Sequence, residues 1–215
     1  MEPWLVSIPQ AVKDRYEVMN YNHAVEIMTQ AYRTEFDEIL ASLQAFVLHK
    51  QDLVTQGGNE SSIPKQFSSL LRPLDWQEMK VTGDLLVKLH GCSSVTITEH
   101  LVENFIDGHN IDYIKGSIAI DIEWNSKDQT FDRDLFAFRT LYECGIIACG
   151  VIITRSESLN TVFRRMNIMG KYGASTTWIG KLTPRLSARR HGGCPILVVG
   201  ITPHCIADWS DDDNA

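Results

Sequence analysis

Three carboxylates lie close together in residues 110–125, NIDYIKGSIAIDIEWN, and two of them share one face of a predicted strand. Residues 117–124 alternate between small or polar side chains and Ile or Trp, and this two-residue period is typical of a β-strand. Asp121 and Glu123 therefore point to the same side, about 7 Å apart along the strand. Two acids at this spacing can share a cation.

The third carboxylate, Asp112, belongs to the preceding strand of a predicted hairpin. Lys115 and Gly116 can close a two-residue loop, which sets Asp112 opposite Ala119 and diagonal to Asp121. Diagonal neighbours lie about 7–8 Å apart, so both carboxylates can reach one cation. The arrangement depends on the register, because a slip of one residue turns Asp112 to the other face.

Three carboxylates on one sheet face repel each other unless a positive charge lies between them. A hard divalent cation such as Mg²⁺, which prefers oxygen ligands, is the simplest partner. The alternative is a half-exposed strand whose polar face merely carries acids. Acids are poor strand formers, and the polar residues 125–128 follow directly, so the pattern favours a metal site.

The chain carries a formal net charge of −7, yet its basic residues are concentrated in one segment. Residues 155–194 hold eight basic residues and a single acid, Glu157, so this segment is +7 and the remainder is −14. A local basic zone favours a polyanion, because phosphate contacts depend on the local field. A solvated basic face is the alternative, but the acidic hairpin favours a metal together with a phosphate backbone.

The order of predicted elements indicates an α/β fold with a mixed central sheet flanked by helices. Residues 130–144 form an amphipathic helix, and the apolar runs 146–154 and 195–201 are typical of strands buried on both faces. A strand, a helix and a buried strand in succession describe a crossover between parallel strands, whereas the hairpin is antiparallel.

The N-terminal half predicts a helix that begins after Asn22 and continues to about residue 43. Shorter helices and strands follow, with helices at residues 64–71 and 74–80 and strands at residues 84–90 and 94–98. A single domain of residues 1–207 accounts for the length. The acidic tail, residues 208–215, is predicted to be disordered.

The cellular location is predicted from what the chain lacks. No run of 18 apolar residues is present, so we expect no membrane span. The N-terminus has no basic region followed by an apolar stretch, so we expect no secretory signal. Five cysteines without a CxxC pair favour reduced thiols in the cytoplasm.

The spacing of Asp112, Asp121 and Glu123 resembles the PD-(D/E)xK nuclease motif, and further blocks resemble the BglII/BamHI group of type II restriction endonucleases. The block YNHA from residue 21 is similar to the start of that group's first helix. Residues 151–154 resemble its next core strand, and residues 174–177 its recognition loop. The resemblance implies a restriction-endonuclease-like PD-(D/E)xK core in a prokaryotic cytoplasmic protein.

Carried over to this chain, the resemblance implies that Asp112, Asp121 and Glu123 are catalytic. Asp112 and Asp121 take the metal-ligand positions, and the carbonyl of Ile122 is a further ligand. Glu123 stands where the wider superfamily has Lys, where BglII-like enzymes have Gln and where BamHI-like enzymes have Glu. Glu123 therefore either holds a metal or orients the attacking water.

The implied activity is Mg²⁺-dependent hydrolysis of double-stranded DNA, with Mn²⁺ as a possible substitute, by a homodimer that cuts a short palindrome. Two alternatives are a structure-selective or repair nuclease of the same superfamily, and a DNA-binding protein that does not cut. The hydroxyls of residues 175–177 can read bases or can merely cap the next helix. The expected DNA-binding residues are Asn125, Ser126, Lys127, Arg133, Arg164, Arg165, Lys171, Ser175, Thr176, Thr177, Arg189 and Arg190.

Overall fold

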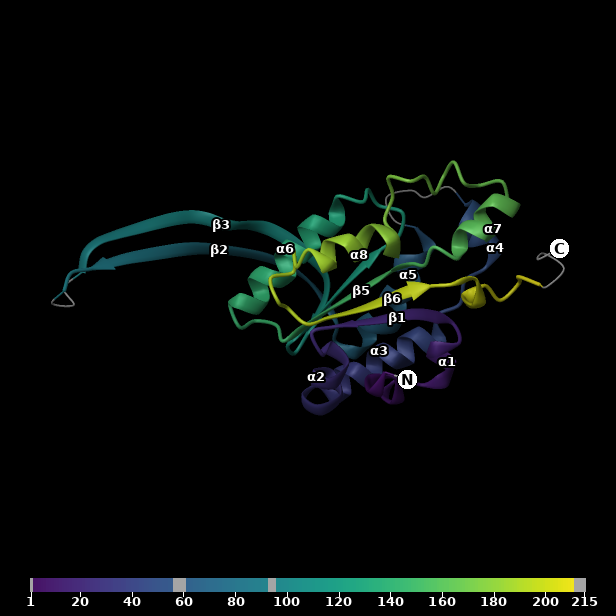
Figure 1. Ribbon diagram of the computed structural model, residues 1–215, viewed down its shortest axis with the longest axis horizontal. Coiled ribbons are helices and arrows are strands. Elements are labelled where there is room, and N and C mark those ends of the chain that lie inside the picture. The colour runs from purple at the N-terminus through teal and green to yellow at the C-terminus, as the bar shows by residue number, and fades with distance from the viewer. Residues whose placement is uncertain (1, 56–60, 93–95, 211–215) are drawn as a thin grey trace.

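The computed structural model describes residues 2–55, 61–92 and 96–210, and its centre is a six-stranded mixed sheet. The strand order is β1-β6-β5-β4-β3-β2 (Figure 1). The strands are β1 (Tyr16–Tyr21), β2 (Gln77–His90), β3 (Thr96–Lys115), β4 (Ile118–Glu123), β5 (Cys149–Arg155) and β6 (Ile196–Ile201). β4, β5 and β6 are mutually parallel, and the other neighbours pair antiparallel, which confirms the predicted mixed sheet.

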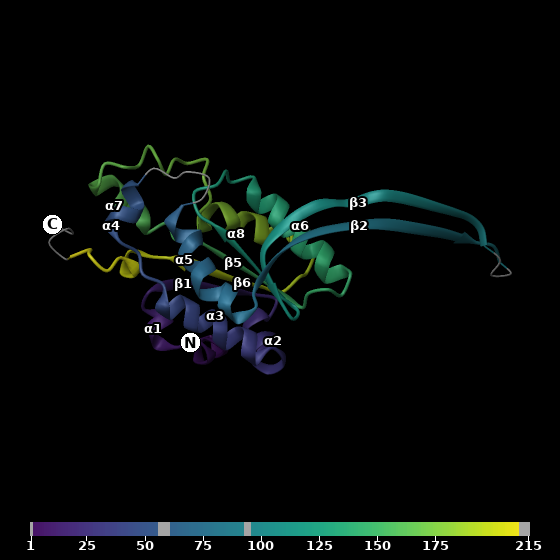
Figure 2. The ribbon, with the colours of Figure 1, turned by 180° about the vertical axis from the view of Figure 1, so that it is seen from behind.

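Helices cover both faces of the sheet. The helices are α1 (Gln10–Lys13), α2 (Ala24–Ala31), α3 (Arg33–Ala45), α4 (Lys50–Val54), α5 (Ser62–Leu71), α6 (Thr130–Glu143), α7 (Leu159–Arg165) and α8 (Ile179–Ser187). Short 3-10 turns occupy Pro3–Ser7, Arg72–Leu74 and Pro203–Cys205. α6 and α8 lie on the opposite side of the sheet from α1, α2 and α3 (Figure 1, Figure 2).

Strand β4 lies between two separate cores. Ile118, Ile120 and Ile122 pack into the core shared with α2, α3 and α5, whereas Ala119 packs beneath α6 and α8. The predicted alternation is therefore present, but the face that carries Asp121 is covered by helices rather than open to solvent. The acids of this face lie in a buried environment.

The crossover from β4 through α6 to β5 follows the predicted strand, helix and strand. α6 ends one residue earlier than expected, and β5 begins at Cys149 because the preceding residues form the turn after the helix. Gly150 interrupts the apolar run of β5, since a Cβ at this position would lie 2.3 Å from the Phe138 ring. The glycine thus lets α6 pack directly on the sheet.

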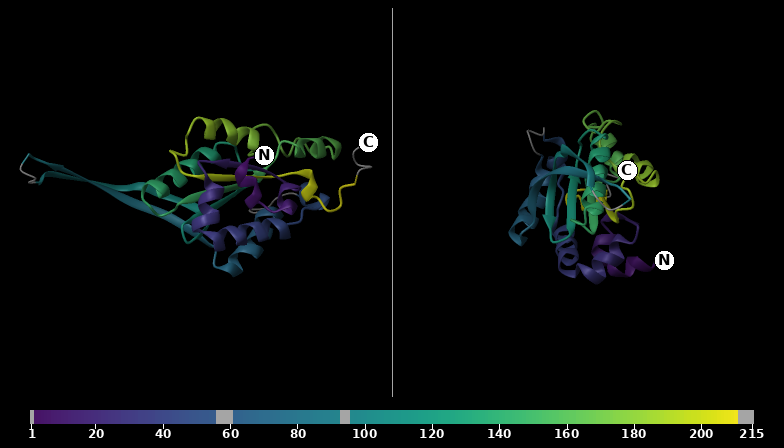
Figure 3. Two further views of the ribbon diagram at one scale, coloured as in Figure 1. Left: turned by 60° about the horizontal axis from the view of Figure 1, so that its bottom comes forward. Right: turned by 90° about the vertical axis from the view of Figure 1, so that its left-hand side faces the viewer.

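Strands β2 and β3 form a long two-stranded arm that projects from the body (Figure 1, Figure 3). They pair from Gln77 opposite Ile114 to His90 opposite Thr96. The expected helix at residues 74–80 is wrong, because residues 77–80 belong to β2. The expected strand at residues 84–90 is part of β2. Of the expected strand at 94–98, residues 94 and 95 lie outside the described residues and residues 96–98 belong to β3.

The hairpin loop of β3 and β4 is one residue further along than predicted. Lys115 pairs with Ile118 and Ile114 with Ala119, so Gly116 and Ser117 form the loop. Gly116 has φ +53°, a left-handed conformation that a residue without Cβ adopts at little cost. Since the shift moves the partner of each β3 residue by two positions, Asp112 keeps the face of Asp121 and becomes level with it.

The N-terminal helix and the C-terminal tail also differ from expectation. The helix predicted after Asn22 is two helices, because Tyr32 leaves the helical conformation with φ −132°. Asp208 accepts a hydrogen bond from the Lys50 amide (2.8 Å), and Trp209 packs against the main core, so the expected disorder does not include them. Residues 211–215 lie outside the described part of the chain. None of the described helices is long and apolar enough to cross a membrane.

Candidate active site

Two crossed hydrogen bonds tie Asp112 to strand β4. The Asp112 amide donates to Oδ1 of Asp121 (3.0 Å), and the Ile122 amide donates to Oδ2 of Asp112 (2.8 Å). Each carboxylate is thereby oriented by the backbone of the neighbouring strand. The two acids form the floor of the candidate site.

A bulge in β3 turns more than one side chain toward this floor. Where β3 passes residues 77–79 of β2, it contains one residue more than its partner, which is a β-bulge. Ile111 packs beneath α6, whereas Tyr113, two residues on, packs in the opposite core. The alternation of faces is broken between them, so Asp112 and the earlier residue His109 both lie on the α6 side.

Helix α6 adds a fourth acid, Asp134, whose side chain points into the same space. Nε2 of His109 lies 3.7 Å from Oδ1 of Asp134, too far for a hydrogen bond. His109, Asp121 and Asp134 each offer a ligand atom, and these atoms all lie within 4.8 Å of one another. Within the described residues this is the one group of three or more metal-binding side chains at that spacing.

Several acid oxygens at the site are buried without a hydrogen-bond partner. They are Oδ2 of Asp121, Oε2 of Glu123 and Oδ2 of Asp134, and Nε2 of His109 is also without a partner. The three acids are only 3%, 8% and 2% exposed, respectively. Buried polar atoms are normally hydrogen-bonded, so this concentration of exceptions indicates a missing positive partner.

Burial raises the pKa of all three acids. The pKa of Glu123 rises to about 7, chiefly because burial disfavours its charge and also because the Asp112 carboxylate is near. Burial, with the charges of neighbouring carboxylates, holds the pKa values of Asp121 and Asp134 well above their ordinary values. A cation at the site would reverse these shifts, since it favours the ionised acids.

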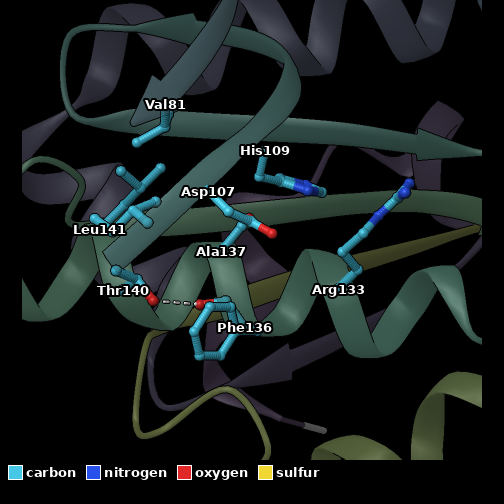
Figure 4. Close-up of a pocket in the computed structure, with 9 residues that line it drawn as sticks. Val81, Asp107, His109, Arg133, Phe136, Ala137, Thr140 and Leu141 are labelled. Carbon is cyan, nitrogen blue, oxygen red and sulfur yellow. Dashed lines mark hydrogen bonds between the residues drawn. The ribbon is translucent and has the colours of Figure 1, made fainter. Parts of the chain in front are cut away.

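Arg133 brings positive charge to the rim of the acid cluster. Its guanidinium lowers the pKa values of Asp121, Glu123 and Asp134 and so offsets part of their elevation. Arg133 and His109 line an apolar-walled cleft between α6 and the base of the arm (Figure 4). The Arg133 guanidinium is accessible to a substrate, because its side chain is exposed.

The turn after β4 is paired with a second loop, residues 173–177. The Thr177 amide donates to the Ser126 carbonyl (2.9 Å), and the Asp128 amide donates to the Ser175 carbonyl (2.9 Å). Lys127 and Thr176 form an isolated antiparallel bridge between these bonds. The hydroxyl-rich loop is therefore fixed directly beside the end of the acidic strand.

Arg155, at the end of β5, fixes the hydroxyl-rich loop by two hydrogen bonds. Its Nε donates to the Thr177 carbonyl (2.8 Å), and Nη2 donates to the Thr176 hydroxyl. The guanidinium lies 5.5 Å from the Phe163 ring centroid and 5.4 Å from that of Tyr172. Burial lowers its pKa to about 10, well above neutral pH, so the charge is kept.

The sequence comparisons agree with this geometry. The family model described as restriction endonuclease BglII/BglIII matches residues 16–201. The chain belongs to this restriction endonuclease family. Membership makes nuclease its activity class and DNA its partner, and it agrees with the α/β fold of a mixed sheet flanked by helices. A comparison with curated proteins gives no match.

The donor set at the site fits a divalent cation of the kind that restriction endonucleases use. Carboxylate oxygens are preferred ligands of Mg²⁺ and Mn²⁺, and three of them are buried here without a partner. The expected site residues Asp112, Asp121 and Glu123 lie on one sheet face. His109 and Asp134 complete the acidic site from β3 and α6.

The predicted DNA-binding residues fall into two structural groups. Exposed or half-exposed side chains surround the acidic end of β4 or lie on the basic segment, namely Asn125, Ser126, Lys127, Arg133, Arg164, Arg165, Ser175 and Arg189. The other four are Lys171, Thr176, Thr177 and Arg190, and each has a hydrogen bond within the protein, as Arg165 and Ser126 of the first group also have interactions of their own. Lys171 donates to the carbonyls of Leu53 (2.9 Å) and Thr55, and Thr177 is fully buried.

In the folded structure, several residues of the basic segment (residues 155–194) lie beside acids that are distant in sequence. Arg190 and Arg185 both pair with Asp132 of α6, and Arg185 and Lys181 lie within 4 Å of Asp128. These ion pairs neutralise part of the positive charge that was predicted to bind a polyanion. Among the basic residues of the described segment, Arg164 and Arg165 at the end of α7 are both exposed.

One local feature of the sequence points to Asp134, although it is not part of the carboxylate motif. Asp134 lies between Phe131 and Leu135 on the buried face of an amphipathic helix. A buried acid on such a face must find a partner. No comparable signal existed for His109, because its orientation depends on the bulge.

Proposed function

We propose that the chain is a type II restriction endonuclease that hydrolyses phosphodiester bonds of double-stranded DNA at a short palindromic site with Mg²⁺. The observation that carries the proposal is the set of buried acid oxygens without partners at the end of β4, in a chain of the BglII/BglIII family. A cation would satisfy these oxygens in their ionised form, and hydrolysis of a phosphodiester is the chemistry that a cation among carboxylates supports.

Asp112, Asp121 and Glu123 would hold the ion, with the carbonyl of Ile122 as a further ligand and Mn²⁺ as a possible substitute for Mg²⁺. When bound, the ion supplies Lewis acidity for the phosphate and lowers the pKa of the attacking water. The crossed hydrogen bonds of Asp112 and Asp121 keep both carboxylates oriented before substrate arrives. A preformed site of this kind costs little reorganisation during the reaction.

Glu123 would either help to hold the ion or orient the attacking water. The bound ion offsets the raised pKa of this carboxyl, so Glu123 is ionised at neutral pH and can accept a hydrogen bond from the water. Arg133 supplies a fixed positive charge near the acids, in a family whose wider superfamily has Lys at the position of Glu123. The guanidinium would face the charge that develops on the phosphate.

The DNA would lie across the end of β4, between the turn at residues 125–128 and the loop at residues 173–177. The hydroxyl of Ser175 and the side chain of Asn125 are suited to base edges, and Lys127 is suited to phosphate. Arg164, Arg165 and Arg189 would contact phosphates further along the duplex. The tie between the two loops couples base contacts to the position of the acidic strand.

A homodimer is the expected assembly, because a palindrome and an isologous dimer share one two-fold axis. Each subunit would cut one strand. α6 is the proposed interface element, since Phe136 on its outer face is 55% exposed.

Incubation of the protein with a long DNA and Mg²⁺ tests the proposal. Discrete fragments support a site-specific restriction endonuclease, and the sequenced ends identify the target. A smear would instead indicate a structure-selective or repair nuclease of the same superfamily. Intact DNA, together with measurable binding, would indicate a DNA-binding protein that does not cut.

A further inference from the structure

Three side chains from three elements form a compact ligand set beside the proposed catalytic acids. His109 comes from β3 above the bulge, Asp121 from β4 and Asp134 from α6, and their ligand atoms lie within 4.8 Å of one another. The side chains of His109 and Asp134 are only 12% and 3% exposed. A set this close and this buried is enclosed by the protein rather than spread over its surface.

Each of these three side chains has one buried polar atom without a hydrogen-bond partner. Oδ1 of Asp121 accepts the Asp112 amide, whereas Oδ2 is buried without a partner. Oδ2 of Asp134 and Nε2 of His109 are likewise buried without partners. Three side chains this close together, each with a buried polar atom that lacks a hydrogen bond, fit a ligand set rather than a polar network.

The arrangement differs from that of Asp112 and Glu123, which are absent from this group. Asp121 belongs to both sets, since its Oδ1 accepts a hydrogen bond from the Asp112 amide and its carboxylate also offers an oxygen within 4.8 Å of the ligand atoms of His109 and Asp134. The two sets therefore meet at one carboxylate. Carboxylates with two oxygens are suited to lie between two cation positions.

We propose that His109, Asp121 and Asp134 form a second cation position that selects a divalent transition metal such as Mn²⁺ over Mg²⁺ and Ca²⁺. An imidazole nitrogen favours transition metals, whereas Mg²⁺ and Ca²⁺ prefer an all-oxygen set. The inference rests on the proposed metal-dependent nuclease and extends it to a position with its own ligands. Mg²⁺ held by Asp112, Asp121 and Glu123 does not depend on His109.

Mn²⁺ binding to the full chain without DNA tests this second position directly. Pulsed electron paramagnetic resonance detects nitrogen coupled to Mn²⁺ when an imidazole is a ligand, and calorimetry gives the Kd. We expect nitrogen coupling in the wild type, its loss in His109→Gln, and a rise in the Kd of that position of about tenfold or more in His109→Gln and Asp134→Asn. His100→Gln in the arm and Glu143→Gln at the end of α6 are matched controls that should leave both readouts unchanged.

The absence of nitrogen coupling in Mn²⁺-loaded wild type would overturn the inference without any variant. Coupling that persists in a folded His109→Gln, verified by its circular dichroism, would also overturn it. Cleavage with Mg²⁺ together with either result would mean that the proposed function stands and the second position does not. Coupling that depends on His109 in a protein that fails to cut DNA would mean the reverse.

Discussion

Glu123→Gln should stabilise the protein without metal while it abolishes cleavage, because the buried carboxylate is costly when charged. The pKa of Glu123 rises from 4.5 to about 7, and its side chain is 8% exposed. A rise of that size corresponds to about 3 kcal/mol of unfolding free energy once the acid is ionised. Gln keeps the shape and can still accept a hydrogen bond from Ser126, so removal of the charge is the main change.

The sign of the pH dependence follows from the raised pKa. Between pH 4.5 and about 7 the folded protein binds a proton at Glu123 that the unfolded chain has released, so stability falls as pH rises. The cost is small near pH 5 and complete above about pH 7. The advantage of Glu123→Gln should therefore be slight at pH 5 and reach about 3 kcal/mol at pH 8.

Thermal unfolding with chelator at both pH values measures this advantage. For a domain of this length, about 3 kcal/mol corresponds to a rise in Tm of about 6–12 °C at pH 8. Mn²⁺ at about one thousand times the Kd of the site that includes Glu123 should reverse the order, since it stabilises the wild type by about 4.1 kcal/mol, more than the advantage of the variant. Glu143→Gln, an exposed acid paired with Arg139, is the control and should not shift Tm. A Glu123→Gln variant that is less stable than wild type at pH 8 without metal would refute the reasoning.

Five further substitutions test the site and the assembly. Asp121→Ala should abolish cleavage of plasmid DNA but retain binding in a gel-shift assay, and cleavage near the wild-type rate would remove Asp121 from the active site. Arg133→Gln should slow cleavage by about 10²-fold at saturating DNA, whereas an equal loss of binding would reduce its role to a DNA contact. Arg164→Ala should weaken cognate and random DNA alike and lower the salt slope by about one, while Ser175→Ala should cost about 1–3 kcal/mol on cognate DNA alone. Sedimentation at micromolar concentration should show a dimer that Phe136→Glu dissociates, and a wild-type monomer of 24.3 kDa would contradict the assembly.

Local patterns in the sequence were sufficient for the central elements of the fold. The alternation over residues 117–124 predicts β4 and sets Asp121 and Glu123 on one face, because side chains of a strand alternate strictly. The apolar face of residues 130–144 predicts α6, and the apolar runs that follow predict β5 and β6, since both periods are local properties of the chain. The carboxylate spacing was likewise visible without coordinates.

Tertiary structure alone decided how strongly these acids are buried and what else joins them. The bulge near Asp112 breaks the alternation of β3, so no period in the sequence could place His109 on the same side. Asp134 reaches the site only because α6 packs over β4. Pairing of Arg190 with Asp132, 58 residues apart, similarly removes charge that the sequence seemed to leave free.

Local sequence patterns also failed to predict the arm formed by β2 and β3. Residues 77–90 have no uniform period, and their pairing with β3 contains four irregularities, so the sequence indicated a helix and a short strand there. Strand pairing along the arm joins residues as much as 37 positions apart, from Gln77 opposite Ile114. Local patterns determined which segments are strands and helices in the body of this protein. Long-range pairing decided the structure of the arm, the strand register and which side chains surround the acids, because these depend on contacts that no short stretch of sequence contains.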